Sequence, residues 1–348
     1  MNTNYILNHL IYLTDTFYDS KTKSDIPYIN IYSKIIDGHY QHIPAPDEGI
    51  SCVDDVARAI ILAFELFEFF NNKEARTFAL RMLNFIEYMT DEDGYVTNFI
   101  FSSSGDRKLG IPSSYKGGMW WSARAKWALS KAYKVTHDDK YLNLYRKIKI
   151  SREYGNDIAG LLVLAELELD ELKDNDLVQI LIDKIINSID SGGYFKHVKD
   201  EQETHMWGYH ELEAVAKVAK NKNHANLMKY CIATLNTLVI DQVRNKYYYS
   251  YPDRKTDGLC AYCVSPFIRG LYEMYLTTTN EKVLNLLNNS INWFYGDNNY
   301  KTTFYDNKTG RCLDGIHEGR VSTNTGAESA VETGFCEVRR LLLKQPEE

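Results

Sequence analysis

The chain has 348 residues, a formal net charge of -7 and no block of Lys or Arg. Nucleic-acid binding needs clustered basic residues that replace phosphate counterions, so the charge argues against nucleic acid and against an anionic membrane surface. No apolar run approaches the roughly 20 residues of a membrane span, and the N-terminus does not resemble a signal peptide, so we expect a cytoplasmic protein. The absence of a linker-like tract predicts one domain over residues 1–348.

Cysteine and histidine spacing gives no sign of a metal site. The six cysteines are thinly spread and are expected to be free thiols. Cys260 and Cys263 form a C-x-x-C pair, but Cys312 and Cys336 stand too far apart to complete a zinc site. The histidines show neither H-x-x-x-H nor H-E-x-x-H spacing. We therefore expect no metal and no other cofactor.

The predicted elements are helices that alternate between one-sided and almost fully apolar. An amphipathic helix is predicted from Tyr5 to about Asp19, followed by irregular chain with an extended piece at 28–32. A nearly all-apolar helix runs from Val53 to Phe70. A half-exposed helix follows it at 73–89. Four helix pairs and a last single helix are predicted after that, at 119–136 with 138–148, 158–169 with 177–189, 207–220 with 224–243, 260–276 with 283–294, and 325–343.

The more buried helices are predicted to begin near residues 53, 119, 157, 206, 260 and 325. Alternate helices in an up-and-down string point the same way, so all six beginnings would gather on one face. The pattern predicts an all-α fold in which twelve helices form a closed ring of six helical hairpins, with short extended segments in the loops.

The charges that open the helix at 53 have two interpretations. Ser51 and Asp54 have the spacing of a capping box, and acids are favoured at a helix N-terminus without any chemistry. Asp55 is not needed for that cap. Asp55 and Arg58 are therefore either a plain intrahelical ion pair or part of a functional site.

Three motifs carry a resemblance to a known family: DDVARA at 54–59, WGYHE at 207–211 and NTGAES at 324–329. Together with the alternating helices, they resemble the six-hairpin glycosidase superfamily, the (α/α)6 toroids. More narrowly, the chain is similar to helical-toroid proteins with D-D-N-A-R-A and N-Q-G-A-E-S signatures, which are associated with glycan loci and glycosyltransferase fusions. Val56 replaces Asn and Thr325 replaces Gln in those signatures, so the roles of these two polar side chains are absent here.

The resemblance implies a carbohydrate substrate, a cleft at the inner-helix N-termini and a functional association with a glycosyltransferase. Glycoside hydrolysis needs one protonated and one ionised carboxyl across the scissile bond. Asp55 is our first candidate for the ionised carboxylate. Glu211 borders an apolar stripe that should raise its pKa, which suits the general acid. Asp54 and Glu328 are further catalytic candidates, although Thr325 and Glu328 also have capping-box spacing.

Other residues at these helix beginnings are candidates for binding substrate. Arg58 can keep Asp55 charged or bind an acid group of the substrate. A tryptophan at a helix mouth can stack on a sugar ring or cover the core, and a histidine can shuttle a proton in a sugar epimerase or isomerase. A non-catalytic carbohydrate-binding scaffold is a third possibility. The binding candidates are Arg58, Trp120, Trp121, His205, Trp207, Tyr209, His210, Asp314 and Glu318.

Overall fold

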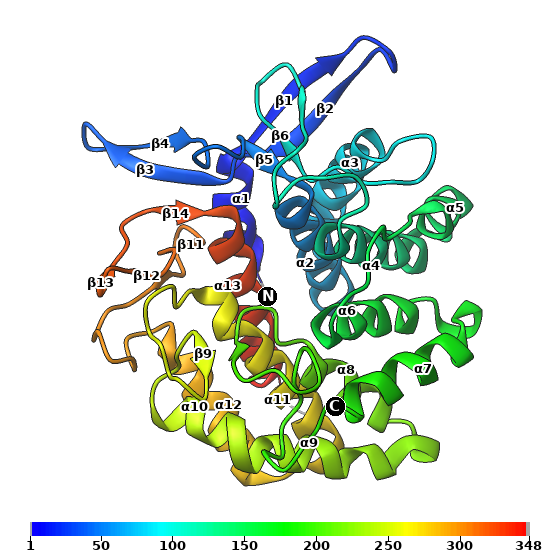
Figure 1. Ribbon diagram of the computed structural model, residues 1–348. Coiled ribbons are helices and arrows are strands. Elements are labelled where there is room, and N and C mark those ends of the chain that lie inside the picture. Colours follow the sequence, from blue (N-terminus) through cyan, green and yellow to red (C-terminus); the bar gives the residue numbers. More distant parts are fainter. Residues whose placement is uncertain (1, 346–348) are drawn as a thin grey trace.

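The computed structural model describes residues 2–345, whose helices form two concentric rings (Figure 1). Each inner helix contacts the next one along the chain, and the last closes the ring against the first. The closed ring brings the two ends of the described chain together. The inner helices are α2 (Val53–Phe70), α4 (Met119–Thr136), α6 (Asn156–Leu167), α8 (Glu211–Ala219), α11 (Ser265–Thr278) and α13 (Ala327–Leu342).

One outer helix covers each inner helix, which confirms the predicted (α/α)6 toroid. The helix against α8 is continuous from α9 (Met228–Thr234) through the π-helical η4 (Leu235–Val239) to α10 (Ile240–Arg244). No helix in the described part of the chain is both long and apolar enough to cross a membrane. The other outer helices are α1 (Asn8–Leu13) on α13, α3 (Lys73–Met89) on α2, α5 (Asp139–Lys147) on α4, α7 (Asn175–Ile186) on α6 and α12 (Glu281–Trp293) on α11.

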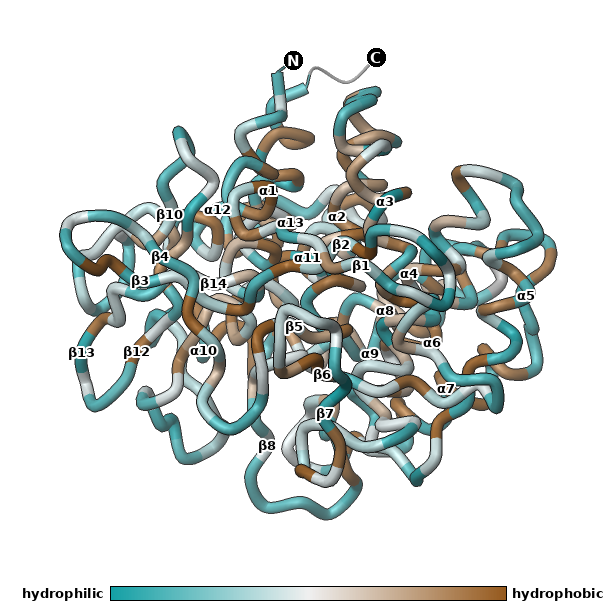
Figure 2. Tube along the Cα trace, turned by 90° about the horizontal axis from the view of Figure 1, so that it is seen from above, coloured by the Kyte–Doolittle hydropathy of each residue, from teal (hydrophilic) through white to brown (hydrophobic). Residues whose placement is uncertain are grey.

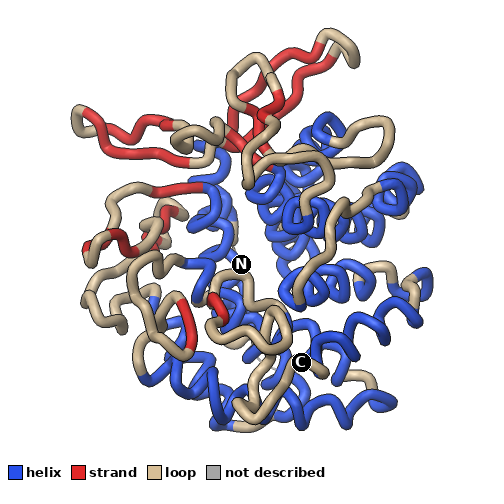
Figure 3. The backbone as a smooth tube through the Cα atoms, in the orientation of Figure 1, coloured by secondary structure: helices blue, strands red, loops and turns tan. Residues whose placement is uncertain are grey.

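Short antiparallel strands lie in the connections between helices, at the rim of the toroid (Figure 3). Strands β5 to β8 gather at one end of the helices (Figure 2). The sheets are β1 (Thr14–Asp19) with β2 (Ser24–Ile29); β14 (Thr325–Gly326), β3 (Tyr32–Ile36) and β4 (His39–Ile43); β5 (Ser51–Cys52), β6 (Phe99–Ile100) and β7 (Arg107–Lys108); β8 (Thr204–His205) with β9 (Ser250–Tyr251); β10 (Tyr305–Asp306) with β11 (Arg311–Cys312); and β12 (Ile316–His317) with β13 (Arg320–Val321).

The two rings differ in how their helices begin. The outer helices α3, α5, α7 and α12 start at Asn72, Asp138, Asp174 and Asn280, whose side chains accept a hydrogen bond from the first turn. Within residues 2–345, no N-cap residue of an inner helix makes such a bond with its own side chain. Groups outside the N-cap serve the first turn of α2 instead, since the side-chain oxygen of Asn98 accepts from the N–H of Asp54.

Buried ion pairs hold neighbouring inner helices together along the axis of the toroid. Arg269 of α11 binds both carboxylate oxygens of Glu213 on α8, at 2.8 and 2.9 Å. Arg269 also lies 3.8 Å from Glu65 of α2, which in turn binds Arg339 of α13. Opposite charges offset the high cost of taking each charge out of water. The axis is thus filled by charged side chains below the first turns.

The predicted helix from Tyr5 to Asp19 is wrong beyond Leu13. Residues 14–19 form β1, which pairs residue by residue with β2. Phe17, which the helical pattern places on the apolar face, is also on the buried side of the strand and packs against Tyr28 and Tyr88. Strand pairing with a partner ten residues away overrides the local helical pattern.

Both predicted capping boxes are also wrong. Ser51 lies in β5, and the side-chain oxygen of Asn98 accepts from the Asp54 N–H at 3.3 Å. At α13, the Thr325 hydroxyl pairs with a hydroxyl of β3, and the Ser329 hydroxyl accepts from the N–H of Gly326. The carboxyl groups of Asp54 and Glu328 therefore make contacts other than caps.

Candidate active site

A cavity of about 350 Å³ opens where α2 and α13 begin. The first turns of these two helices form one wall, and the chain around residues 98, 258 and 314 forms the others. The cavity contains many more carboxyl groups than cations. Its lining residues are Ile31, Tyr32, Glu48, Cys52, Asp54, Asp55, Arg58, Asn98, Phe99, Ser113, Gly258, Cys260, Asp314, His317, Glu328 and Ser329.

Arg58 joins three carboxylates at the base of this cavity. Its Nη2 donates to Asp55 at 2.7 Å and to Glu328 at 2.9 Å, and its Nη1 donates to Glu332 at 3.0 Å. Its Nε donates to the backbone oxygen of Asp54 at 3.3 Å. The predicted Asp55–Arg58 pair exists, but it is part of a bridge between α2 and α13. Each nitrogen of Arg58 already binds an oxygen, so the guanidinium is poorly placed to take a substrate carboxylate.

Two carboxyl groups of the cavity have raised pKa values. Burial raises the pKa of Asp55, which is 3% exposed, to about 6, although Arg58 acts in the opposite direction. Burial also raises the pKa of Asp314 to about 7, against a 2.8 Å hydrogen bond from the Ser329 hydroxyl. The side chain of Glu328 is 42% exposed and stays beside Arg58. The cavity thus holds two carboxyl groups whose pKa values burial raises toward neutrality, the range in which acid–base catalysis works.

A hydrogen-bonded chain leads from this cavity toward the other inner helices. The Asp54 carboxylate pairs with Arg124 of α4 at 2.6 Å, and Arg124 donates to the Tyr262 hydroxyl at 2.5 Å. His210 lies 3.0 Å from the same hydroxyl, on its other side. The Arg58 guanidinium also stacks over the Tyr262 ring, 4.7 Å from its centroid. Tyr262 therefore fixes the orientation of both arginines.

Glu211 lies in a different cluster and is not among the residues that line the cavity. It is 0% exposed, and its Oε1 is 2.6 Å from Nδ1 of His197. Burial raises the pKa of Glu211, as predicted. Burial lowers the pKa of His197, but the Glu211 carboxylate outweighs it and raises that pKa to about 10. Glu211 is fully buried against His197 and does not line the cavity that Asp55 lines.

Three of the aromatic candidates form a partly exposed wall beside this second cluster. The rings of His205 and Trp207 stack at 3.9 Å with an interplanar angle of 6°, and Trp120 lies 5.5 Å from Trp207. The Trp120 indole donates to Asp157 at 2.9 Å. Burial, followed by the charge of His197, lowers the pKa of His205 to about 3, so its imidazole is neutral. All three side chains are only half-buried.

Four predicted binding residues are placed elsewhere. Trp121 is buried and donates to the Val96 carbonyl, and Tyr209 is buried and donates to the Phe195 carbonyl. Both serve the core, because a long apolar side chain at a helix mouth can turn inward. His210 is buried beneath Tyr262. Glu318 is exposed in the turn after β12 and is not among the residues lining the cavity.

Sequence reasoning missed several residues that complete these clusters. Asp157 stands at the beginning of α6, so the rule that pointed to Asp55 and Glu211 would also have found it. Arg124 and Glu332 lie further inside helices, where the sequence gives no sign that their charges face the axis.

All six cysteines are free thiols, and the described residues contain no group of three His, Cys, Asp or Glu that could hold a metal ion.

Comparison with known proteins identifies the class of fold. No family model matches the chain, and no curated protein matches its sequence significantly. Solved structures that match over almost the whole chain show that it has an (α/α)6 toroid fold. The narrower likeness to toroids with D-D-N-A-R-A and N-Q-G-A-E-S signatures stays a prediction.

Three of these solved structures illustrate the likeness. The chain is similar to a sugar epimerase from a ruminal bacterium, with a TM-score of 0.72, 12% identity, and 98% of this chain and 97% of that chain covered. Cellobiose 2-epimerase from Bacillus thermoamylovorans B4167 has a TM-score of 0.69 and 14% identity, with 97% and 99% covered. An unsaturated glucuronyl hydrolase specific for heparin has a TM-score of 0.60 and 12% identity, with 98% and 96% covered. At these identities the likeness establishes the fold alone.

Proposed function

We propose that the protein is a glycoside hydrolase whose active site is the carboxyl-rich cavity between α2 and α13. The observation that carries this proposal is that Asp55, Asp314 and Glu328 line one cavity at the beginnings of inner helices. Solved toroids of the same fold include a family 88 glycosyl hydrolase and an unsaturated glucuronyl hydrolase. Residues 1–348 would act as one domain, because both ends of the chain contribute to the ring that bears the cavity.

In this mechanism Asp314 is the general acid and Asp55 is the ionised carboxylate. Protonated Asp314 donates its proton to the glycosidic oxygen as the bond to the anomeric carbon breaks. Asp55, held ionised by Arg58, either attacks the anomeric carbon or removes a proton from an attacking water. Glu328 on the same Arg58 nitrogen adds negative charge that favours the oxocarbenium-like transition state. Asp314 replaces Glu211 as acid because Glu211 is sealed from the cavity.

The assignment predicts a bell-shaped dependence of kcat/KM on pH. The rate rises with pH as Asp55 loses its proton near pH 6 and falls as Asp314 loses its proton near pH 7. In the Asp314→Asn variant, kcat/KM should no longer fall above pH 7, and its maximum should be about 100-fold or more below that of the wild type. Steady-state rates with an aryl glycoside from acid to mildly alkaline pH measure both effects. An unchanged falling limb in the variant would remove Asp314 from the mechanism.

The charge of the cavity predicts which sugars are cleaved. Five carboxyl residues line it, Glu48, Asp54, Asp55, Asp314 and Glu328, whereas the one arginine in the lining already binds oxygen through all three nitrogens. We expect aryl glucosides or galactosides to be hydrolysed with kcat/KM at least about 100-fold above that of the matching aryl glucuronide, because like charges repel. Assays with one leaving group measure this ratio. A glucuronide rate equal to the glucoside rate would contradict it, and no hydrolysis of any glycoside would reject the hydrolase itself.

A sugar epimerase or isomerase is the second candidate function, and His205 is the observation that favours it. Its neutral imidazole lies in the aromatic wall with Trp120 and Trp207, and its Nδ1 is 3.0 Å from the backbone oxygen of Trp207. Solved neighbours include a cellobiose 2-epimerase and a D-mannose isomerase. Incubation with cellobiose or mannose in D2O separates the candidates, since deuterium in recovered sugar supports proton abstraction and released monosaccharide supports hydrolysis.

A cytoplasmic location and a glycosyltransferase partner stay predictions.

A further inference from the structure

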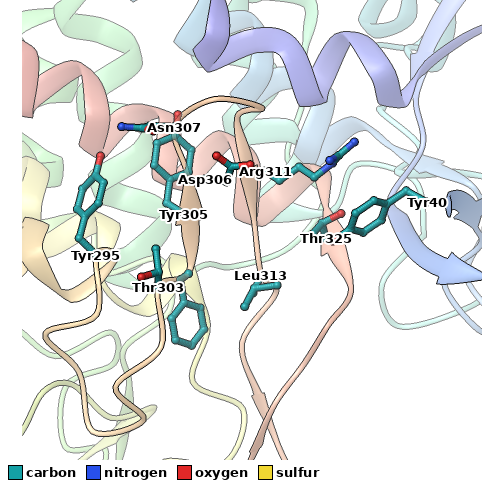
Figure 4. A pocket seen from close by; sticks show the side chains of 10 residues that line it. Tyr40, Tyr295, Thr303, Tyr305, Asp306, Asn307, Arg311, Leu313 and Thr325 are labelled. Carbon is teal, nitrogen blue, oxygen red and sulfur yellow. The ribbon is translucent and has the colours of Figure 1, made fainter. Parts of the chain in front are cut away.

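A second cavity, of about 460 Å³, lies on the other side of the strands that border the candidate active site. Leu313 and Thr325 line this second cavity, whereas Asp314, the next residue along the chain, lines the first. Figure 4 shows Tyr40 and Arg311 together at one side of it, with Tyr295 and Tyr305 at the other. The cavity falls within the roughly 300–1,000 Å³ range of small-molecule sites.

The Arg311 guanidinium forms no ion pair with a carboxylate among residues 2–345. Its buried Nε has no hydrogen-bond acceptor in this part of the chain. The guanidinium carbon lies 4.4 Å from the centroid of the Tyr40 ring and 5.8 Å from that of the Tyr12 ring. Leaving a guanidinium donor buried and unbonded costs free energy, which a bound acceptor would recover.

The nearest acid, Asp306, stands opposite Arg311 in the hairpin and attracts it, but no ion pair joins the two among the described residues. Asp306 is already engaged, because its two oxygens accept from the N–H of Lys308 at 2.9 Å and from the Thr309 hydroxyl at 2.7 Å. Tyr305 is 2% exposed, and its hydroxyl has no hydrogen-bond partner in the described chain. The unused hydrogen-bonding capacity of the cavity is therefore mostly that of donors.

We propose that this cavity binds an acidic sugar through its carboxylate. The planar guanidinium of Arg311 matches a carboxylate with two parallel hydrogen bonds. The Tyr305 hydroxyl can donate to a sugar oxygen, and the tyrosine rings offer apolar surface to a pyranose ring. A hexuronic acid combines the three features: one carboxylate, several hydroxyls and apolar C–H faces. The site binds without chemistry and does not depend on the proposed hydrolase activity.

Calorimetric titration of the full-length protein with glucuronate, glucose and acetate tests the proposal. Glucuronate should bind at least tenfold more tightly than glucose or acetate. Arg311→Gln should weaken glucuronate binding at least tenfold. Tyr305→Phe, which deletes one hydroxyl, should weaken it severalfold. Equal binding of glucose and glucuronate, equal binding of acetate, or full affinity in Arg311→Gln would overturn the proposal.

Three controls locate the binding and report on folding. Lys308→Gln removes one positive charge from the same hairpin but not from the cavity, so glucuronate affinity should not change. Asp55→Asn should also leave it unchanged, and loss of binding there would place glucuronate in the first cavity and overturn the proposal. Arg311→Lys keeps the positive charge but cannot make two parallel hydrogen bonds to a carboxylate. Its affinity for glucuronate should lie between those of wild type and Arg311→Gln. Thermal melts of each variant verify folding.

Discussion

Asp55→Asn is expected to lower kcat/KM for aryl glycosides about 1,000-fold or more, with little change in stability. The amide keeps the size of the carboxylate but can neither attack carbon nor accept a proton from water. Arg58 retains Glu328 and Glu332, so no buried charge is left without a partner. Burial already raises the pKa of Asp55, and a neutral amide is therefore well tolerated at this position. Steady-state kinetics and denaturant unfolding of the purified variant measure the two effects.

A matched control for Asp55→Asn is Asp93→Asn, which makes the same chemical change at an exposed turn. This control should keep the wild-type rate and stability. Wild-type rates in Asp55→Asn would remove Asp55 from the mechanism. A large loss of stability together with activity would instead show that Asp55 serves the fold, through its bond to Arg58.

Arg269→Met is expected to destabilise the fold by about 3–5 kcal/mol, the typical cost of breaking a buried ion pair from one side. Glu213 is 0% exposed, and its burial would raise its pKa. Arg269, followed by Lys217, instead holds the pKa of Glu213 well below its usual value. Without Arg269 the carboxylate keeps the weaker support of Lys217, at 3.2 Å, and of His210, at 3.5 Å. Urea or guanidinium unfolding measures the loss.

The matched control for Arg269→Met is Lys255→Met, which breaks the exposed pair between Lys255 and Glu203. It should cost less than about 1 kcal/mol, because water and salt screen surface charges. Adding Glu213→Gln to Arg269→Met should recover part of the stability, since the unpaired charge is then removed. Equal stability of Arg269→Met and wild type would show that the axial ion pairs do not hold α8 and α11 together.

The alternation of helices could be predicted from the sequence because the buried face of a helix appears as apolar residues at helical spacing. The apolar shaft of α2 and the one-sided pattern of α3 gave the bounds 53–70 and 73–89, as the structure has them. The α8 beginning was predicted near 206 but lies at Glu211, because Gly208 adopts a positive φ of 71° in a turn before the helix. The strand at 14–19 was missed because Phe17 continues the helical spacing of the apolar residues before it, whereas pairing with β2 makes this segment extended.

The sequence by itself determined the ring of hairpins, the face on which the inner helices begin and the acidic nature of that face. These follow from apolar periodicity and from charges placed at helix beginnings, which are local properties of the chain. Only the tertiary structure decided which acids share a cavity. Asp314 and Glu328 join Asp55 there, whereas Glu211 turns to His197. Side-chain direction and the choice of ion partner depend on packing between helices distant in sequence, and no local pattern encodes them.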